Sequence, residues 1–379
     1  MVALDEQALE EALALKGVLL RRDDFGWNKY VTPDSARQFA WGIGDENPLY
    51  CEEEYGRKTR WGAGLAPSCF LFTVDTTVVA PRLPGVTWMY AGVEWEWYLP
   101  LTFWRRLRTE VRLVDASLHS GQHVRNFIIQ TGECLFFDAQ TGELVARALG
   151  STFRIPRASE DGGLSYDSRP PHRYSSAELE AIDECVRAET AQGAAVRYWD
   201  DVQPGDELSP VVKGPLNSTD MICWYSTGHF YRAYERAVRY RWRHPGHAYM
   251  NEQTGAPDNP ARGHAEASMA RAVGMPGIYD GGPQRISFAN HLLSNWMGDD
   301  GFLRVLKMRV TRPNVLGDTT WVRGTVTAKS DEIRPALAGP GSCSEVSIDL
   351  KMVNQMGVTT ANGSASVLLP RRDQSDASR

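Results

Sequence analysis

Histidines and carboxylates that could share a proton gather in one stretch of the second half of the chain. His264 stands between Asp258 and Glu266, and Asp220 and His229 precede them. Imidazole suits acid and base catalysis because its reference pKa of about 6.5 lies near working pH. An acid within hydrogen-bond reach of His264 would favour catalysis, whereas the simpler interpretation is a satisfied histidine on a helix face.

Several other kinds of site are excluded by the sequence. It contains no phosphate loop, no GxSxG elbow and no HExxH motif. The six cysteines show no CxxC and no Cys/His pair at metal-ligand spacing, which predicts unpaired, reduced cysteines and no metal site. Lys plus Arg is 41 and Asp plus Glu is 47, so the net charge of −6 indicates no general attraction to nucleic acid.

The first residues predict an acidic amphipathic helix rather than a targeting segment. MVALDEQALEEALALKG lacks the positively charged start and apolar run of a signal peptide. No uninterrupted apolar stretch of about 18 residues occurs, so no contact with a membrane is expected. We therefore expect a cytoplasmic protein.

An internal repeat organises the 379 residues. Four anchor pairs keep an offset between 212 and 215: Asn47 with Asn259, Pro100 with Pro313, Gly142 with Gly357, and Pro156 with Pro370. In each copy, runs rich in Val, Thr, Ile and Phe are separated by turns at 139–142 and 354–357, which predicts antiparallel meanders. The edges of the two meanders are expected to pair with each other.

A helix that is apolar on nearly every side precedes each meander, at 67–79 and at 284–296. A buried helix wrapped by a curved antiparallel sheet is the hot-dog arrangement. The predicted fold class is therefore α+β, a double hot dog. The expected organisation is an N-terminal helix (1–27), a first repeat (28–156), a linker with a helix at 176–190 (157–197), a second repeat (198–370) and a disordered tail (371–379).

The ordered motifs resemble those of MaoC-like dehydratases and R-specific enoyl-CoA hydratases over residues 28 to 370. GDENPLY at 44–50 resembles their GDxNPxH element, with Tyr50 in the place of the histidine. GLAP at 64–67 is similar to the start of their central helix, and 198–216 to the start of the catalytic half of fused members. From His264 to Gly274 the chain matches HxDxxxAxxxG, with Glu266 replacing the aspartate.

The resemblance implies a hydratase or dehydratase acting on 2-enoyl and 3-hydroxyacyl thioesters. In that family a histidine and an aspartate share the water, and backbone amides at the start of the buried helix polarise the thioester. The second repeat is then the catalytic half, with His264 as the acid/base. Its acidic partner stays open among Asp258, the first choice, Asp220 and Glu266, and His229 stands where relatives carry SGD.

The remaining candidate residues are implied to bind the substrate. Asp45, Asn47 and Tyr50 belong to the degenerate half that shapes the acyl pocket. Tyr279, Gly281 and Gly282 precede the buried helix, where a glycine would let the thioester approach bare backbone, although an ordinary turn would also explain them.

A departure from the family pattern lies at Phe103 and Trp104. They stand where the second copy keeps the family's turn as Gly317 and Asp318. Aromatic side chains are costly to expose, so we expect both to line a pocket or an interface.

The substrate implied is an acyl-CoA or acyl-carrier-protein thioester, without a cofactor, and the assembly a homodimer or a heteromer with a related hot-dog subunit. Arginines in two basic stretches are either solvated or hold the phosphates of the carrier: Arg105, Arg106, Arg108, Arg112, Arg232, Arg236, Arg239, Arg241 and Arg243. The altered motifs leave two alternatives open. One is an inactive acyl-binding protein or partner subunit, and the other is an enzyme with different chemistry, such as a natural-product cyclisation.

Overall fold

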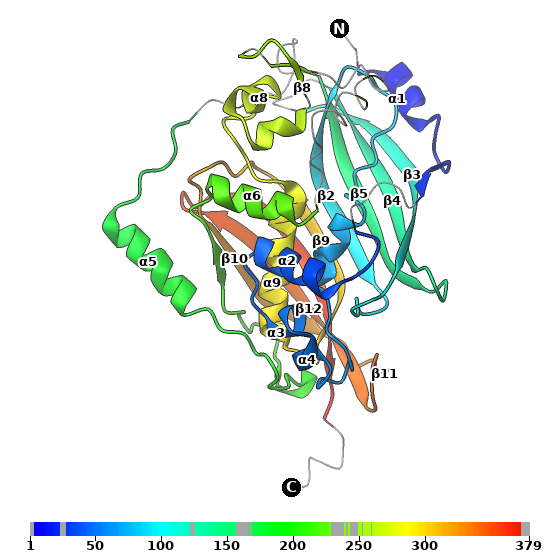
Figure 1. Cartoon of the computed structure of the whole chain (residues 1–379), viewed down its shortest axis with the longest axis vertical. Helices are drawn as coiled ribbons and strands as arrows, with labels where there is room; N and C mark the ends of the chain where they lie inside the picture. Colours follow the sequence, from blue (N-terminus) through cyan, green and yellow to red (C-terminus); the bar gives the residue numbers. More distant parts are fainter. Residues whose placement is uncertain are drawn as a thin grey trace.

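The computed structural model describes residues 4–22, 28–121, 126–156, 166, 169–228, 239, 242, 249–251, 253–258 and 260–372. Within them, eleven strands form one sheet, of which ten run in the order β1-β3-β4-β5-β2-β9-β13-β12-β10-β6 and β11 pairs with β12 (Figure 1). These strands are β1 (Leu19–Arg22), β2 (Thr87–Trp97), β3 (Leu107–His119), β4 (Phe127–Asp138), β5 (Leu144–Ile155), β6 (Val211–Lys213), β9 (Phe302–Val310), β10 (Thr320–Lys329), β11 (Arg334–Pro335), β12 (Ser342–Asn354) and β13 (Thr359–Pro370). A separate hairpin pairs β7 (Tyr249–Met250) with β8 (Pro257–Asp258).

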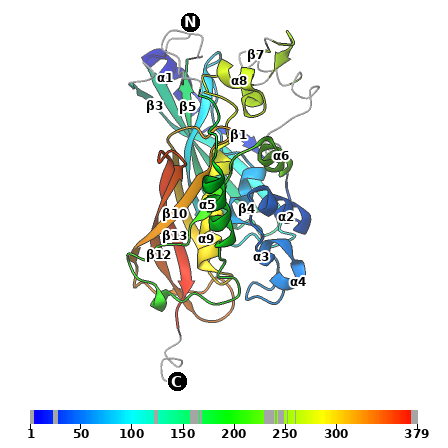
Figure 2. The same cartoon turned by 90° about the vertical axis from the view of Figure 1, so that its left-hand side faces the viewer.

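The sheets of the two repeats join edge to edge. Strand β2 of the first meander pairs antiparallel with β9 of the second, from Gly92 opposite Arg309 to Glu96 opposite Val305. The views in Figures 1 and 2 show the resulting sheet running from the cyan strands of the first repeat into the orange and red strands of the second. The prediction that the two meanders pair at their edges is confirmed.

Alternating side chains give the sheet one buried face. Burial along β4 alternates at every residue, as expected for a strand with one face on a core. The first-repeat core is aromatic. Trp95 and Trp97 stack with ring centroids 5.2 Å apart, and Phe136 lies 5.4 Å from Trp95.

The described residues also form α-helices and 3-10 helices. They are α1 (Glu6–Leu13), α2 (Pro33–Gly42), α3 (Pro48–Cys51), α4 (Glu53–Gly56), α5 (Ser176–Arg187), α6 (Ser218–Ser226), α8 (Ala267–Ala272) and α9 (Gly282–Met297), with the 3-10 helices η1 (Ser68–Thr73), η2 (Trp199–Asp201) and η4 (Pro260–His264). The predicted central helix of the second repeat is confirmed as α9, whose 16 residues are nearly all buried. Figure 1 shows α9 behind α2 and α6. Helices α2 and α6 pack closely against each other at Gly42, where a Cβ would lie only 3.2 Å from the carbonyl oxygen of Cys223.

The predicted central helix of the first repeat is wrong. Only Ser68–Thr73 is helical, and it is a 3-10 helix; the chain then runs without regular structure over β4 and β5. Two glycines allow this close approach, because a Cβ on Gly150 would lie 2.1 Å from the carbonyl oxygen of Thr77, and one on Gly132 2.0 Å from Val79. Most residues from 73 to 79 are β-branched, which also disfavours a helix.

Two smaller expectations can also be compared with the structure. All six cysteines are free, as predicted. The N-terminal helix and the linker helix are shorter than expected, ending at Leu13 and Arg187. Among the described residues, no helix is long and apolar enough to cross a membrane.

Candidate active site

His264 ends η4 and lies against the segment that leads into α9. Its Nδ1 is 2.8 Å from the carbonyl oxygen of Tyr279. Because a carbonyl only accepts, Nδ1 must carry the hydrogen, and Nε2 is left as an acceptor. Burial lowers the pKa of His264 below its usual value, while the bond to Tyr279 and the charge of Asp280 oppose that shift. The ring is therefore neutral and basic near pH 7.

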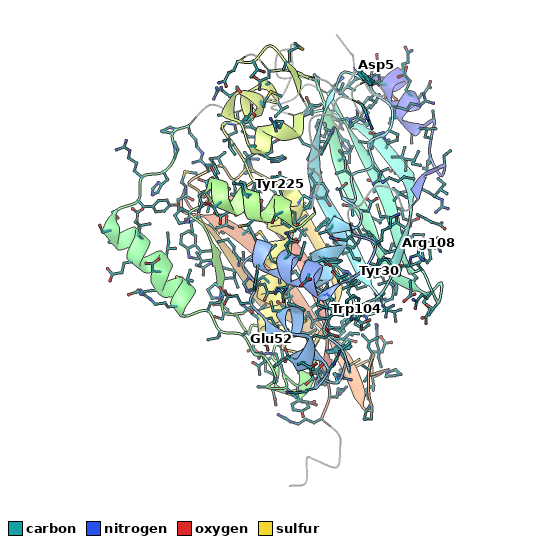
Figure 3. The ribbon with its side chains drawn as sticks, in the orientation of Figure 1. Asp5, Tyr30, Glu52, Trp104, Arg108 and Tyr225 are labelled. Atoms are coloured by element: carbon teal, nitrogen blue, oxygen red, sulfur yellow. The ribbon has the colours of Figure 1, made fainter. Side chains whose placement is uncertain are left out.

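Two tyrosines flank the imidazole. The ring of Tyr279 lies 4.2 Å from that of His264, centroid to centroid, and the ring of Tyr225 lies 6.0 Å away. Tyr225 comes from α6 and is labelled in Figure 3. Sequence reasoning missed it, because an aromatic residue on an apolar helix is indistinguishable from a core residue by spacing.

The start of α9 is held by a buried ion pair. Asp280 accepts hydrogen bonds from Arg285, including one of 2.8 Å from Nε, and both side chains are almost wholly buried. Arg285 also donates to the carbonyl oxygens of Arg312, at 2.5 Å, and Thr360, at 3.0 Å. These bonds fix the first turn of α9 against the end of the second-repeat sheet.

Gly281 and Gly282 border the same cavity as His264 and Tyr279. Gly281 is the N-cap of α9 and Gly282 its first residue. A Cβ on Gly282 would lie 2.7 Å from the ring of Tyr90 on β2, whereas one on Gly281 would meet no atom closer than 3.5 Å. Gly282 is thus required by packing against the first repeat, and Gly281 is not.

The two described acidic candidates are engaged elsewhere. Glu266 accepts a hydrogen bond of 2.9 Å from Asn251 and forms an ion pair of 3.2 Å with Arg262. Asp220 accepts the backbone N–H of Asn217 at 2.8 Å and so caps its own helix. Neither of them is hydrogen-bonded to His264, and no other carboxylate among the described side chains is.

The other two candidates fall outside what the structure describes. The backbone of Asp258 belongs to β8, but its side chain is outside the described part of the chain. His229 lies outside the described residues altogether. Asp258 therefore stays the predicted partner.

Comparison with known proteins supports the fold. Residues 25–146 match the family model of the FAS1-like dehydratase domain region. A solved MaoC-like dehydratase superposes with a TM-score of 0.62 at 16% identity, covering 95% of this chain and 100% of the other. A MaoC-like dehydratase from Phytophthora capsici gives a TM-score of 0.52 at 11% identity, covering 97% and 99%. Among curated proteins no sequence matches significantly.

The fold is that of the MaoC-like dehydratases.

The MaoC-like motif of the first repeat lies away from the cavity. Asp45 is buried and accepts from the backbone of Asn47 at 3.0 Å and from Ser294 of α9 at 3.1 Å. Asn47 caps α3. Tyr50 is also buried, which raises the pKa of its hydroxyl strongly, and the charge of Asp45 raises it further. Ser294 follows Gly282 by twelve residues, about 18 Å along the helix. None of these first-repeat residues lines the cavity beside His264.

A polar network that the sequence did not predict surrounds this MaoC-like motif. Lys213 lies 2.6 Å from Nδ1 of His291 and donates to the carbonyl oxygen of Gly44 at 3.2 Å. Nε2 of His291 lies 3.0 Å from Glu189 and 4.0 Å from Asp45. Burial lowers the pKa of Lys213 to about 8, and the negative charges of Glu189 and Asp45 oppose that shift. The network links residues of both repeats to His291, in the middle of α9.

Trp104 does not line the cavity, and its place in an interface stays a prediction. Its side chain is 59% exposed, at the surface position labelled in Figure 3, and it does not line the cavity. The backbone of Trp104 is left-handed, with a φ of 70°, like that of its counterpart in the second repeat, Gly317, with a φ of 88°. Phe103 is buried against Gly64, in the core rather than in the cavity.

Proposed function

We propose that this protein interconverts 2-enoyl and 3-hydroxyacyl thioesters by adding or removing water. One observation carries the proposal: the carbonyl oxygen that anchors His264 belongs to Tyr279, two residues before the N-cap of α9. A neutral base and the positive end of a buried helix dipole therefore face one cavity.

The roles follow from the charges that develop during hydration. The thioester carbonyl would lie at the start of α9, where backbone amides and the helix dipole stabilise the enolate oxygen. Nε2 of His264 takes a proton from water as the water oxygen bonds to the β carbon. The imidazolium then returns that proton to the α carbon, which gives the 3-hydroxyacyl product. Dehydration is the reverse.

A second candidate function is favoured by one specific observation. His264 has no carboxylate partner among the described side chains. If Asp258 also points away, the chain binds acyl thioesters without converting them, alone or beside a related active subunit.

Mass spectrometry of a panel of 2-enoyl thioesters incubated with the purified protein tests the proposal. We expect at least one substrate to gain one water, and a saturated thioester of the same chain length to stay unchanged. Binding of both thioesters without a gain of water would leave the acyl-binding function instead.

A further inference from the structure

An aromatic and cationic surface lies at the end of the first-repeat sheet where β3 begins. Trp104 and Tyr30 are 59% and 46% exposed, and Arg106 is exposed as well. Tyr30 pairs with Arg106 in an isolated antiparallel bridge, and the guanidinium of Arg106 lies 5.8 Å from the centroid of the Tyr30 ring. The backbone N–H of Trp104 donates to the carbonyl oxygen of Val31 at 2.6 Å, which holds it beside this pair. Figure 3 labels both aromatic side chains. We call Tyr30, Trp104 and Arg106 the aromatic surface.

Arg106 differs from the other arginines of the first basic stretch. Arg105 pairs with Asp138 at 3.0 Å, and the two arginines that follow in β3 both pair with Glu110, at 2.6 and 3.0 Å. Arg106 forms no ion pair with any described residue, so its charge is available to a partner. Of the second basic stretch, four arginines lie outside the described residues: Arg232, Arg236, Arg241 and Arg243.

The equivalent turn of the second repeat is covered by another part of the chain. Residues 169–174, with the sequence RPPHRY and no regular secondary structure, lie over it. A Cβ on Gly317 would be 3.2 Å from the Cβ of Pro171, and Arg169 forms an ion pair with the buried carboxylate of Asp318. This turn of the hot dog is therefore a place where a proline-containing segment can dock.

The first-repeat turn has the same backbone but opposite charge. Trp104 and Arg105 each stand 213 residues before their counterparts Gly317 and Asp318. Trp104 has a φ of 70°, which glycine adopts freely and other residues rarely do. A residue held in such a conformation is often found at a binding site. Because cations replace the aspartate, a segment that docks here must bring carboxylates in place of arginines.

We propose that the aromatic surface binds an extended segment of a partner protein in which acidic residues flank a pair of prolines. The rings of Trp104 and Tyr30 pack against the prolines, as aromatic side chains do in proline-binding grooves. Arg106 binds a carboxylate of the segment, with the charges reversed relative to Arg169 and Asp318. Tryptophan, tyrosine and arginine are also the residues that contribute most to the affinity of protein interfaces.

The aromatic surface lies far from the candidate active site. Trp104 precedes β3, whereas Gly121, which lines the cavity beside His264, follows that strand. The 13 residues of β3 span about 40 Å. A segment bound at Trp104 leaves the cavity open, so this docking surface is independent of the proposed function.

Fluorescence anisotropy with three labelled peptides tests the inference on the full chain. The probe is Glu-Pro-Pro-His-Glu-Tyr, which is the segment 169–174 with both arginines replaced by glutamate. We expect saturable binding, about tenfold or more tighter than that of Arg-Pro-Pro-His-Arg-Tyr, which has the opposite charge, or of Glu-Ala-Ala-His-Glu-Tyr, which lacks the prolines. W104G and R106E should each weaken binding of the probe about tenfold or more.

Two control variants are matched to these substitutions. W41A removes another tryptophan that is 59% exposed and has an arginine over its ring, and K58E makes the same change of charge as R106E at an exposed lysine. Both should bind the probe like the unaltered protein. Glycine suits the backbone at 104, so W104G should stay folded by circular dichroism; if it does not, R106E decides the outcome.

Three results would overturn the inference: no saturable binding of the probe, equal binding of the three peptides, or unchanged binding by both W104G and R106E. Two further measurements test other occupants. Binding to phosphatidylserine vesicles that is lost in both variants would assign the aromatic surface to a membrane instead. Self-association in analytical ultracentrifugation that is lost in both variants would assign it to a second copy of the chain. Either result would also overturn the inference.

Discussion

The two repeats begin their central helices in opposite ways. In the first repeat, the backbone N–H of Cys69 at the start of η1 donates to Asn290 of α9 at 2.9 Å, and Pro67 before it has no N–H. In the second repeat, Gly281 and Gly282 start α9 beside an open cavity. The start of η1 is thus occupied by Asn290, whereas the start of α9 borders the cavity, where the proposed function places the thioester carbonyl.

The two repeats also differ in the residue at the equivalent motif position, which is Tyr50 in the first repeat and His264 in the second. Tyr50 and His264 are 214 residues apart, close to the offset of the other repeat anchors. Burial raises the pKa of Tyr50 and lowers that of His264, so it favours the neutral form of each. A neutral histidine is a base, whereas a neutral tyrosine is an acid. Since both are neutral, the residue type makes only the second position competent to accept a proton.

The largest expected effect follows from removing the ion pair that holds the start of α9 in the second repeat. Replacing Arg285 with Leu leaves Asp280 as a buried, unpaired charge, and breaking such pairs costs about 3–5 kcal/mol. We expect the free energy of unfolding in urea to fall by that amount. Replacing Arg147, whose pair with Glu133 is partly exposed, should change it by less than about 1 kcal/mol. Equal losses in the two variants would mean that the pair does not hold the helix start.

The next effect concerns the two glycines. Gly282→Ala places a Cβ against Tyr90 and must push the helix start away from its position, so kcat/KM should fall about tenfold or more. Gly281→Ala is the matched control, because its Cβ meets nothing closer than 3.5 Å, and its kcat/KM should stay within about threefold. Steady-state kinetics on one enoyl thioester would compare them. A larger loss for Gly281→Ala would contradict the placement of the substrate.

The pH dependence of kcat/KM should reflect the lowered pKa of His264. Because the pKa of His264 is lowered, its neutral form persists below pH 6.5, and protonation abolishes the base only at lower pH. The acidic limb of kcat/KM for the free enzyme should therefore have its midpoint below 6.5. A profile of rate against pH would show this, and a midpoint above 6.5 would assign the limb to another group.

The smallest effect is expected at Tyr50. Tyr50→Phe removes a buried hydroxyl beside Asp45 and Ser294, which should cost about 1 kcal/mol of unfolding free energy. Turnover should change little, since Tyr50 does not line the cavity. Thermal unfolding and a hydration assay on the same preparation would test both statements. A large loss of turnover with unchanged stability would place Tyr50 in the chemistry.

The sequence predicted what depends on repetition and local pattern. Repeated strand patterns and an apolar helix predict the double meander, the edge pairing and α9. The turn at Trp104 is predicted from its counterpart at Gly317 in the second repeat. The first central helix was predicted wrongly because Gly132 and Gly150, far along the chain, make room for Thr77 and Val79 on the sheet. Such contacts between distant segments leave no local pattern.

In the candidate site, too, some features follow from the sequence and others depend on tertiary contacts. His264 lies beside the segment that leads into α9, and its catalytic role stays a prediction. The engagement of Glu266 by Asn251 and Arg262 depends on tertiary contacts. The burial of Asp45 against Ser294 and the occupation of η1 by Asn290 also involve segments more than 200 residues apart. Spacing alone could not have indicated any of these contacts.

The rate of hydration of a 2-enoyl thioester by His264→Ala tests the central claim most directly. If His264 supplies the base, the rate should fall by about 10² or more while circular dichroism and binding of a saturated thioester stay unchanged. Tyr50→Phe, measured beside it, should keep a rate close to that of the unaltered protein. A near-normal hydration rate in folded His264→Ala would contradict the assignment of catalysis to the second repeat's histidine.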